Sequence, residues 1–217
     1  MWNKLKEQFN HLKLEKKKLY LITNSDKFES KEIFLDAIAS ALQGGVDVVR
    51  LDEPQFPDDV LVEIGRKVRM LCDEFGATFI ISNRCDIARI VEADGVHLQA
   101  GSVNIADARE VLGGTFIVGC DILSADDAVE AFNEGYDYIN MGPLHLNGNK
   151  FNPKIDIDDI DWISRNIEIP LFVQCETESD NVSSVVQMGA QKLALTQAIM
   201  YAQVPEETAR KILKFLP

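Results

Sequence analysis

The chain of 217 residues lacks long apolar runs and is poor in positive charge. No apolar run approaches the roughly 18 residues of a membrane-spanning helix, and the N-terminus lacks the apolar core of a signal peptide. We therefore expect a cytoplasmic protein. Its 22 basic residues face 35 acidic ones, a net charge of −13. This charge argues against nucleic acid or a membrane surface as a partner, because both require basic surface, and it also opposes phosphorylated ligands.

Cysteine and histidine show no spacing typical of metal ligands. The four cysteines are widely spaced without a C-x-x-C pair, and no histidine lies at metal-ligand spacing from a carboxylate. We expect reduced thiols in core or strand-end positions and no confident cofactor. Linkers and low-complexity segments are also missing, which predicts one domain over residues 19–217. Residues 1–18 form an N-terminal extension, where Trp2, Leu5, Phe9 and Leu12 recur at helical spacing. A helix capping one end of the domain is the simpler interpretation, and a membrane-surface anchor is the alternative.

From Leu19 onward, short apolar runs alternate with helical patterns. The runs are continuously apolar, as in parallel strands buried on both faces. The predicted strands are Leu19–Thr23, Val46–Leu51, Thr78–Ser82, Gly95–Leu98, Thr115–Gly119, Tyr138–Met141, Leu171–Gln174 and Lys192–Thr196. The predicted helices cover 33–42, 60–71, 105–112, 125–134, 157–165 and 182–188. About eight strand–helix units favour a single α/β (β/α)₈ TIM barrel over a doubly wound sheet.

Several motifs carry a family resemblance when taken in order around the barrel. They are Gln43-Gly44-Gly45-Val46, Asn83-Arg84-Cys85-Asp86, Ala93-Asp94-Gly95-Val96-His97-Leu98, Tyr136-Asp137-Tyr138-Ile139, Gly142-Pro143 and Ala198-Ile199. Over residues 19–199 the chain resembles the thiamine-phosphate synthase family, including its thiazole-tautomerase relatives. The resemblance implies a barrel that joins a pyrimidine diphosphate to a thiazole phosphate with help from Mg²⁺. The ligand would bind at the carboxyl ends of the strands.

The second predicted strand departs from the family pattern Gln-Leu-Arg-Glu-Lys. This chain has Arg50-Leu51-Asp52-Glu53-Pro54, so two expected cations have become Asp52 and Pro54. Arg50 lies earlier along the strand, and we expect its side chain to point to the opposite face from Asp52. Arg50 and Glu53 remain candidate ligand-binding residues.

The expected metal ligands are also substituted. The resemblance implies Mg²⁺ carboxylates at two positions, which Asn83 and Ser102 occupy here. Mg²⁺ prefers charged oxygen ligands, so it is expected only if the family activity is retained. Arg84 matches the family arginine and, with Asn83, stays a candidate for ligand binding.

At the remaining rim positions, some residues that the resemblance implies are replaced and others are retained. The histidine implied for tautomerase relatives aligns with Leu123, which excludes proton transfer there, whereas Asp121 is a new carboxylate nearby. Asp121, His97 and Lys150 are the catalytic candidates. Glu176 and Gln197 stand where the resemblance implies a phosphate nest. The further ligand-binding candidates are Asn147, Asn149, Lys150, Thr196 and Gln197.

Three functions stay open from these residues. The first is a non-catalytic or repurposed barrel that binds a small molecule at its C-terminal rim. The second is an active thiamine-phosphate synthase, and the third is a different lyase or isomerase chemistry at the same rim. A homo-oligomer is compatible with each of them.

Overall fold

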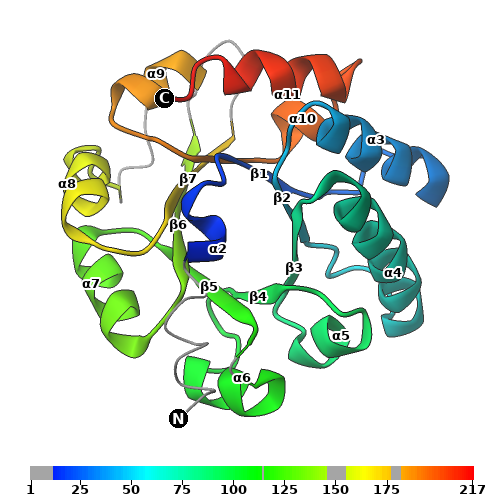
Figure 1. Ribbon diagram of the computed structural model, residues 1–217, viewed down its shortest axis with the longest axis horizontal. Helices are drawn as coiled ribbons and strands as arrows, with labels where there is room; N and C mark the ends of the chain where they lie inside the picture. The colour runs from blue at the N-terminus through cyan, green and yellow to red at the C-terminus, as the bar shows by residue number, and fades with distance from the viewer. Residues whose placement is uncertain (1–11, 114, 146–154, 177–181) are drawn as a thin grey trace.

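Eight parallel strands form a closed barrel in chain order, with β8 pairing to β1 (Figure 1). The computed structural model describes residues 12–113, 115–145, 155–176 and 182–217. This arrangement confirms the predicted (β/α)₈ fold. The strands are β1 (Leu19–Ile22), β2 (Val48–Leu51), β3 (Thr78–Ser82), β4 (Gly95–Leu98), β5 (Ile117–Ile122), β6 (Tyr138–His145), β7 (Leu171–Glu176) and β8 (Leu193–Leu195).

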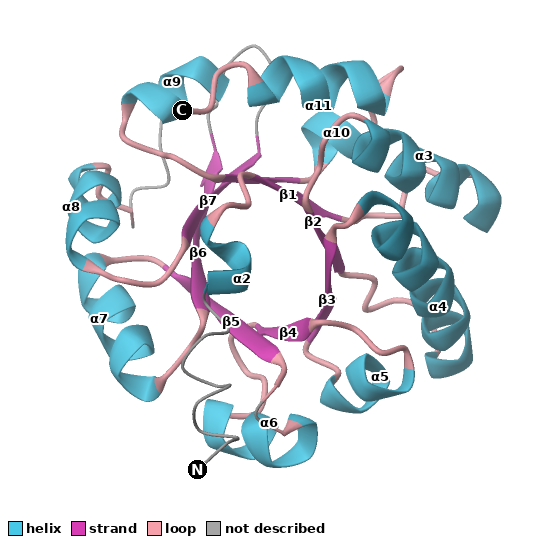
Figure 2. Cartoon of the chain, in the orientation of Figure 1, coloured by secondary structure: helices cyan, strands magenta, loops and turns pink. Residues whose placement is uncertain are grey.

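Helices surround the strands as an outer ring (Figure 2). They are α3 (Lys31–Gln43), α4 (Asp58–Phe75), α5 (Cys85–Ile90), α6 (Ile105–Leu112), α7 (Ala125–Glu134), α8 (Asp158–Asn166), α9 (Val182–Gln187), α10 (Gln197–Met200) and α11 (Pro205–Leu213). The prediction gave β3, β4, α6 and α7 their observed bounds, but it ended β5, β6 and β7 too early. The difference matters most in β5, because Asp121 lies within the strand and not after it.

Strand alternation separates two apolar clusters. Val49 and Ile81 belong to the large cluster between strands and helices, whereas Val48 and Ile80 belong to a smaller cluster inside the barrel. Successive strand residues point to opposite faces, so each strand serves both. A polar residue two positions beyond an inner apolar residue must therefore point into the barrel as well.

A short helix closes the barrel at the amino ends of its strands. Helix α2 (Leu12–Glu15) precedes β1 and lies within the ring of strands in Figure 1. Its Leu14 is fully buried in the inner cluster. The Lys192 ammonium donates to the Leu14 carbonyl at 3.5 Å and to the Lys17 carbonyl at 2.8 Å. Residues 12–15 thus cap one end of the barrel, while residues 1–11 of the predicted amphipathic helix lie outside the described residues.

None of the helices over the described ranges is both long enough and apolar enough to cross a membrane.

Candidate ligand site at the carboxyl end of the barrel

The carboxyl half of the barrel interior is polar. Strand alternation places five polar side chains there, one from each strand between β2 and β6. They are Arg50, Ser82, His97, Asp121 and Asn140. His97 and Asn140 are fully buried, and Arg50 is 2% exposed. The strand register sets Ser82 beside His97 and Asp121 beside Asn140.

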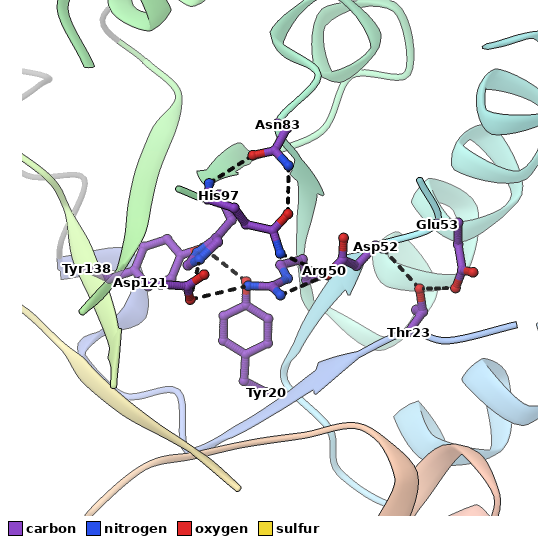
Figure 3. Close-up of polar contacts among 10 residues, drawn as sticks. Tyr20, Thr23, Arg50, Asp52, Glu53, Asn83, His97, Asp121 and Tyr138 are labelled. Atoms are coloured by element: carbon purple, nitrogen blue, oxygen red, sulfur yellow. Dashed lines mark hydrogen bonds and ion pairs between the residues drawn. The ribbon is translucent and has the colours of Figure 1, made fainter. Parts of the chain in front are cut away.

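Arg50 lies at the centre of this polar layer (Figure 3). Its Nη2 donates to Asp52 Oδ2 at 2.9 Å, and its Nη1 lies 4.0 Å from Asp121 Oδ1. The expectation that Arg50 and Asp52 point to opposite faces is therefore wrong. They are two residues apart, and positions i and i+2 of a strand share a face.

The two carboxylates stabilise the charge of Arg50 inside the barrel. Burial acts to lower the pKa of Arg50, but the acidic groups around it, Asp52 and Asp121 among them, outweigh burial, so the net shift is upward. The guanidinium is therefore charged, and two carboxylates, those of Asp52 and Asp121, lie close enough to balance its single positive charge.

His97 connects Asp121 to two buried tyrosines. His97 Nε2 lies 2.9 Å from Asp121 Oδ1, and His97 Nδ1 lies 2.9 Å from the Tyr138 hydroxyl. That hydroxyl is in turn 2.9 Å from the hydroxyl of Tyr20. Burial and then the charge of Arg50 lower the pKa of His97, while burial raises the pKa of both tyrosines.

The hydrogen-bond partners and the direction of these pKa shifts together indicate which atoms of His97, Asp121 and Tyr138 carry protons. Burial acts to raise the pKa of Asp121, but His97 and Arg50 bring it below its ordinary value, so Asp121 is a carboxylate and only accepts. Neutral His97 then donates from Nε2 and accepts from Tyr138 at Nδ1. A carboxylate with a lowered pKa is a weak base, so the arrangement suits Asp121 as a partner of Arg50 better than as a proton acceptor.

A glycine makes room for this chain. An added Cβ at Gly119 on β5 would lie 2.2 Å from ring atoms of Tyr138. The missing side chain thus lets the Tyr138 ring cross the interior to reach His97 and Tyr20.

Two of the other candidate ligand-binding residues, Glu53 and Arg84, lie outside the interior polar layer. Glu53 is buried at the rim, where it accepts from the Thr23 hydroxyl at 2.6 Å and from the Ser25 backbone N–H at 3.0 Å. It thereby joins the loops that follow β1 and β2. Arg84 is the N-cap residue directly before α5, and it forms ion pairs with Asp58 and Asp86. Both side chains thus have protein partners outside the interior layer.

Thr196 and Gln197 follow β8. Thr196 is 9% exposed, and Gln197 is exposed as the first residue of α10. Three candidates, Asn147, Asn149 and Lys150, lie outside the described residues. The structure describes β7 to its end at Glu176 but not that side chain.

Comparison with known proteins decides the family. The model of the thiamine monophosphate synthase family matches residues 19–199, which is most of the chain. The chain belongs to the thiamine monophosphate synthase family. It is 35% identical over 201 residues to a putative thiamine-phosphate synthase of Geobacter sulfurreducens, and the match covers 92% of this chain and 94% of that relative.

Two further similarities agree with this family. A thiamine-phosphate synthase of Nostoc sp. is 32% identical over 196 residues, which cover 90% of this chain but only 54% of that protein. The chain thus spans little more than half of this longer relative. The solved structure of thiamine phosphate pyrophosphorylase from Pyrococcus furiosus superposes with a TM-score of 0.81 at 28% identity, covering 94% of this chain and 96% of that one.

The residues at the family's implied Mg²⁺ positions do not fit this ion. Asn83 Oδ1 accepts from the backbone N–H of Gln99 at 2.8 Å, and Asn83 Nδ2 donates to Gln99 Oε1 at 2.6 Å. Both polar atoms of the Asn83 amide are thus engaged in hydrogen bonds that link the end of β3 to the end of β4. The Ser102 hydroxyl is uncharged. Within the part of the chain that the structure describes, no three His, Cys, Asp or Glu side chains group as a metal site. A hard cation that prefers carboxylate ligands therefore lacks them at these positions.

Sequence reasoning missed Ser82 and Asn140 as site residues, along with the tyrosine pair. The available signal was the alternation of side chains along a strand. Asn140 is a polar residue in an apolar strand, and it lies two residues after the inward-pointing Tyr138, so it must point inward as well. The predicted bounds of β6 already contained that signal.

Proposed function

We propose that this chain is a ligand-binding member of the family that has lost the Mg²⁺-dependent condensation of a pyrimidine diphosphate with a thiazole phosphate. One observation carries the proposal: Asp52 occupies the position of the family's cationic arginine and neutralises Arg50 at 2.9 Å. The fold and the polar interior support a small-molecule site, whereas the charge arrangement opposes a diphosphate. We place the protein in the cytoplasm, with a small molecule as its partner and not nucleic acid or a membrane.

Charge decides between a retained and a lost reaction. A leaving pyrophosphate needs cations that stabilise its growing negative charge. In the described interior, Arg50 is the central cation, and Asp52 and Asp121 both lie against it. A diphosphate drawn to Arg50 would therefore also meet the two carboxylates that lie against it.

The expected loss of activity follows from the substitutions. Each charged contact to a phosphate contributes about 1.5–3 kcal/mol, so the two cations replaced by Asp52 and Pro54 account for about 3–6 kcal/mol. That range corresponds to a rate roughly 10²–10⁴-fold below that of an ordinary synthase.

The test is pyrophosphate release from the pyrimidine diphosphate and thiazole phosphate with Mg²⁺, using the full-length chain. The Nostoc thiamine-phosphate synthase is the positive control. We expect release at least about 10²-fold slower than in the control. A rate within tenfold of the control overturns the proposal and favours an active synthase.

Calorimetry with thiazole phosphate and thiamine phosphate extends this test. Neither compound should bind with the affinity shown by the control enzyme, because the interior already carries excess negative charge. Tight binding of either one, without turnover, would mean that only the chemistry was lost and that the phosphate site survived.

A further inference from the structure

Buried polar atoms without partners gather in one place. Over the described residues, six buried side-chain nitrogen and oxygen atoms have no hydrogen-bond partner, and five of them lie in the barrel interior. They are Arg50 Nε, Arg50 Nη1, Ser82 Oγ, Asn140 Nδ2 and Asn140 Oδ1. Buried polar atoms are nearly always hydrogen-bonded in folded proteins, so this concentration points to a bound polar molecule.

The five unpartnered atoms of the interior include both hydrogen-bond donors and acceptors. Arg50 offers donors only, Asn140 offers one donor group and one acceptor, and Ser82 can do both. Asp121, the register neighbour of Asn140, adds a carboxylate with its side chain 31% exposed. A molecule that places an acceptor beside a donor satisfies this pattern, as a carboxamide or an amino-substituted heterocycle does.

The charge of the layer limits the ligand further. Arg50 contributes one positive charge, and Asp52 and Asp121 contribute two negative charges within 4.0 Å of it. His97 and the two tyrosines add none, because burial favours their neutral forms. Arg50, Asp52 and Asp121 together therefore carry a net charge of −1, so an anionic ligand would raise the excess negative charge in a poorly screened interior.

We propose that the interior layer of Arg50, Ser82 and Asn140 binds an uncharged, unphosphorylated small molecule that presents an acceptor beside a donor. Asp52 is the residue that sets this preference by opposing anions. This inference rests on the proposed function, since it assumes that the mouth of the barrel still takes a ligand.

Acetamide and acetate are matched probes for this proposal, because they share size and shape and differ by one negative charge. Each is titrated into the ¹⁵N-labelled full chain at constant ionic strength, and NMR follows the Asn140 side-chain amide and Arg50 Nε–H. We expect saturable shifts of both signals with acetamide, and acetate binding weaker by about tenfold or more.

Two variants test the assignment. Asn140→Leu should remove the acetamide response at Arg50, and Asp52→Asn should narrow the difference between acetamide and acetate. Equal or tighter acetate binding in the wild type overturns the charge preference. Absence of a saturable shift with either probe, or an Arg50 response unchanged in Asn140→Leu, overturns the site itself. Rapid pyrophosphate release in the synthase assay overturns the proposed function whatever the titrations show.

Discussion

Replacing Asn140 by leucine should stabilise the ligand-free protein. Asn140 is fully buried, and neither polar atom of its side-chain amide has a hydrogen-bond partner in the part of the chain that the structure describes. Each unsatisfied buried polar atom costs about 1–3 kcal/mol of folding free energy. Leucine has the same number of side-chain heavy atoms and removes both penalties, whereas a volume-conserving swap costs below about 1.5 kcal/mol. We expect a net gain of about 2 kcal/mol in the free energy of unfolding.

The measurement is urea unfolding of exhaustively dialysed protein, with calorimetry for the melting temperature. A gain of about 2 kcal/mol corresponds to a rise of roughly 4–8 °C in a chain of this length. Asn104→Leu is the matched control, because the Asn104 amide is satisfied: its Oδ1 accepts from the Asp107 backbone at 2.9 Å at the start of α6. That control should lose about 1 kcal/mol.

The sign of the change in unfolding free energy shows whether the Asn140 amide is unsatisfied in the ligand-free protein or already hydrogen-bonded. A stabilised Asn140→Leu variant with weaker ligand binding means that the amide is kept for function at the expense of stability. A loss of stability in Asn140→Leu as large as in Asn104→Leu would refute the reasoning, because it would show that the buried amide is satisfied in the folded protein.

Two further predictions concern the chain of hydrogen bonds inside the barrel. Gly119→Ala should lower stability by about 1–3 kcal/mol in urea unfolding, because its Cβ would lie 2.2 Å from the buried Tyr138 ring; an unchanged midpoint would mean that the ring moves freely. The free energy of unfolding of the wild type should fall as the pH drops below about 6.5, by up to about 1.4 kcal/mol per pH unit. The reason is that His97 is protonated in the unfolded chain at these pH values, whereas in the folded protein burial beside Arg50, Asp121 and Tyr138 lowers its pKa and keeps it neutral. This contribution is present above the unfolded pKa and is lost on acidification, so His97→Gln should show a shallower slope between pH 6.5 and 5.5 in urea unfolding; parallel slopes would contradict the assignment.

The barrel was predictable because its signals are local. Thr78–Ser82 and Gly95–Leu98 are short, mostly apolar runs that are followed by the polar residues Asn83 and Gln99. Ser124 stands directly before an acidic helical turn. The structure confirms both strands and shows Ser124 capping α7 through a hydrogen bond to the Asp127 backbone N–H. Such features depend on residues a few positions apart, so the chain order itself contains them.

The family motifs were readable from the sequence for the same reason. Asn83 and Asp52 stand where the family resemblance implies a Mg²⁺ carboxylate and a cation, and these two substitutions led to the prediction that the Mg²⁺ and diphosphate chemistry is lost. What they do instead was not readable. Asn83 bonds to Gln99, sixteen residues away, and Asp52 bonds to an arginine that was expected on the other face of the strand.

The sequence by itself therefore determined the fold class, the family and the loss of the expected ligand charges, because these depend on local pattern and residue identity. Only the tertiary structure decided which polar side chains meet. Closing the barrel brings Arg50 from β2 to Asp121 on β5, across a gap of 71 positions in the chain. It also buries the Asn140 side-chain amide without a hydrogen-bond partner among the described residues. Charge balance and unsatisfied hydrogen bonds are properties of that enclosed space, so they exist only once the strands have closed around it.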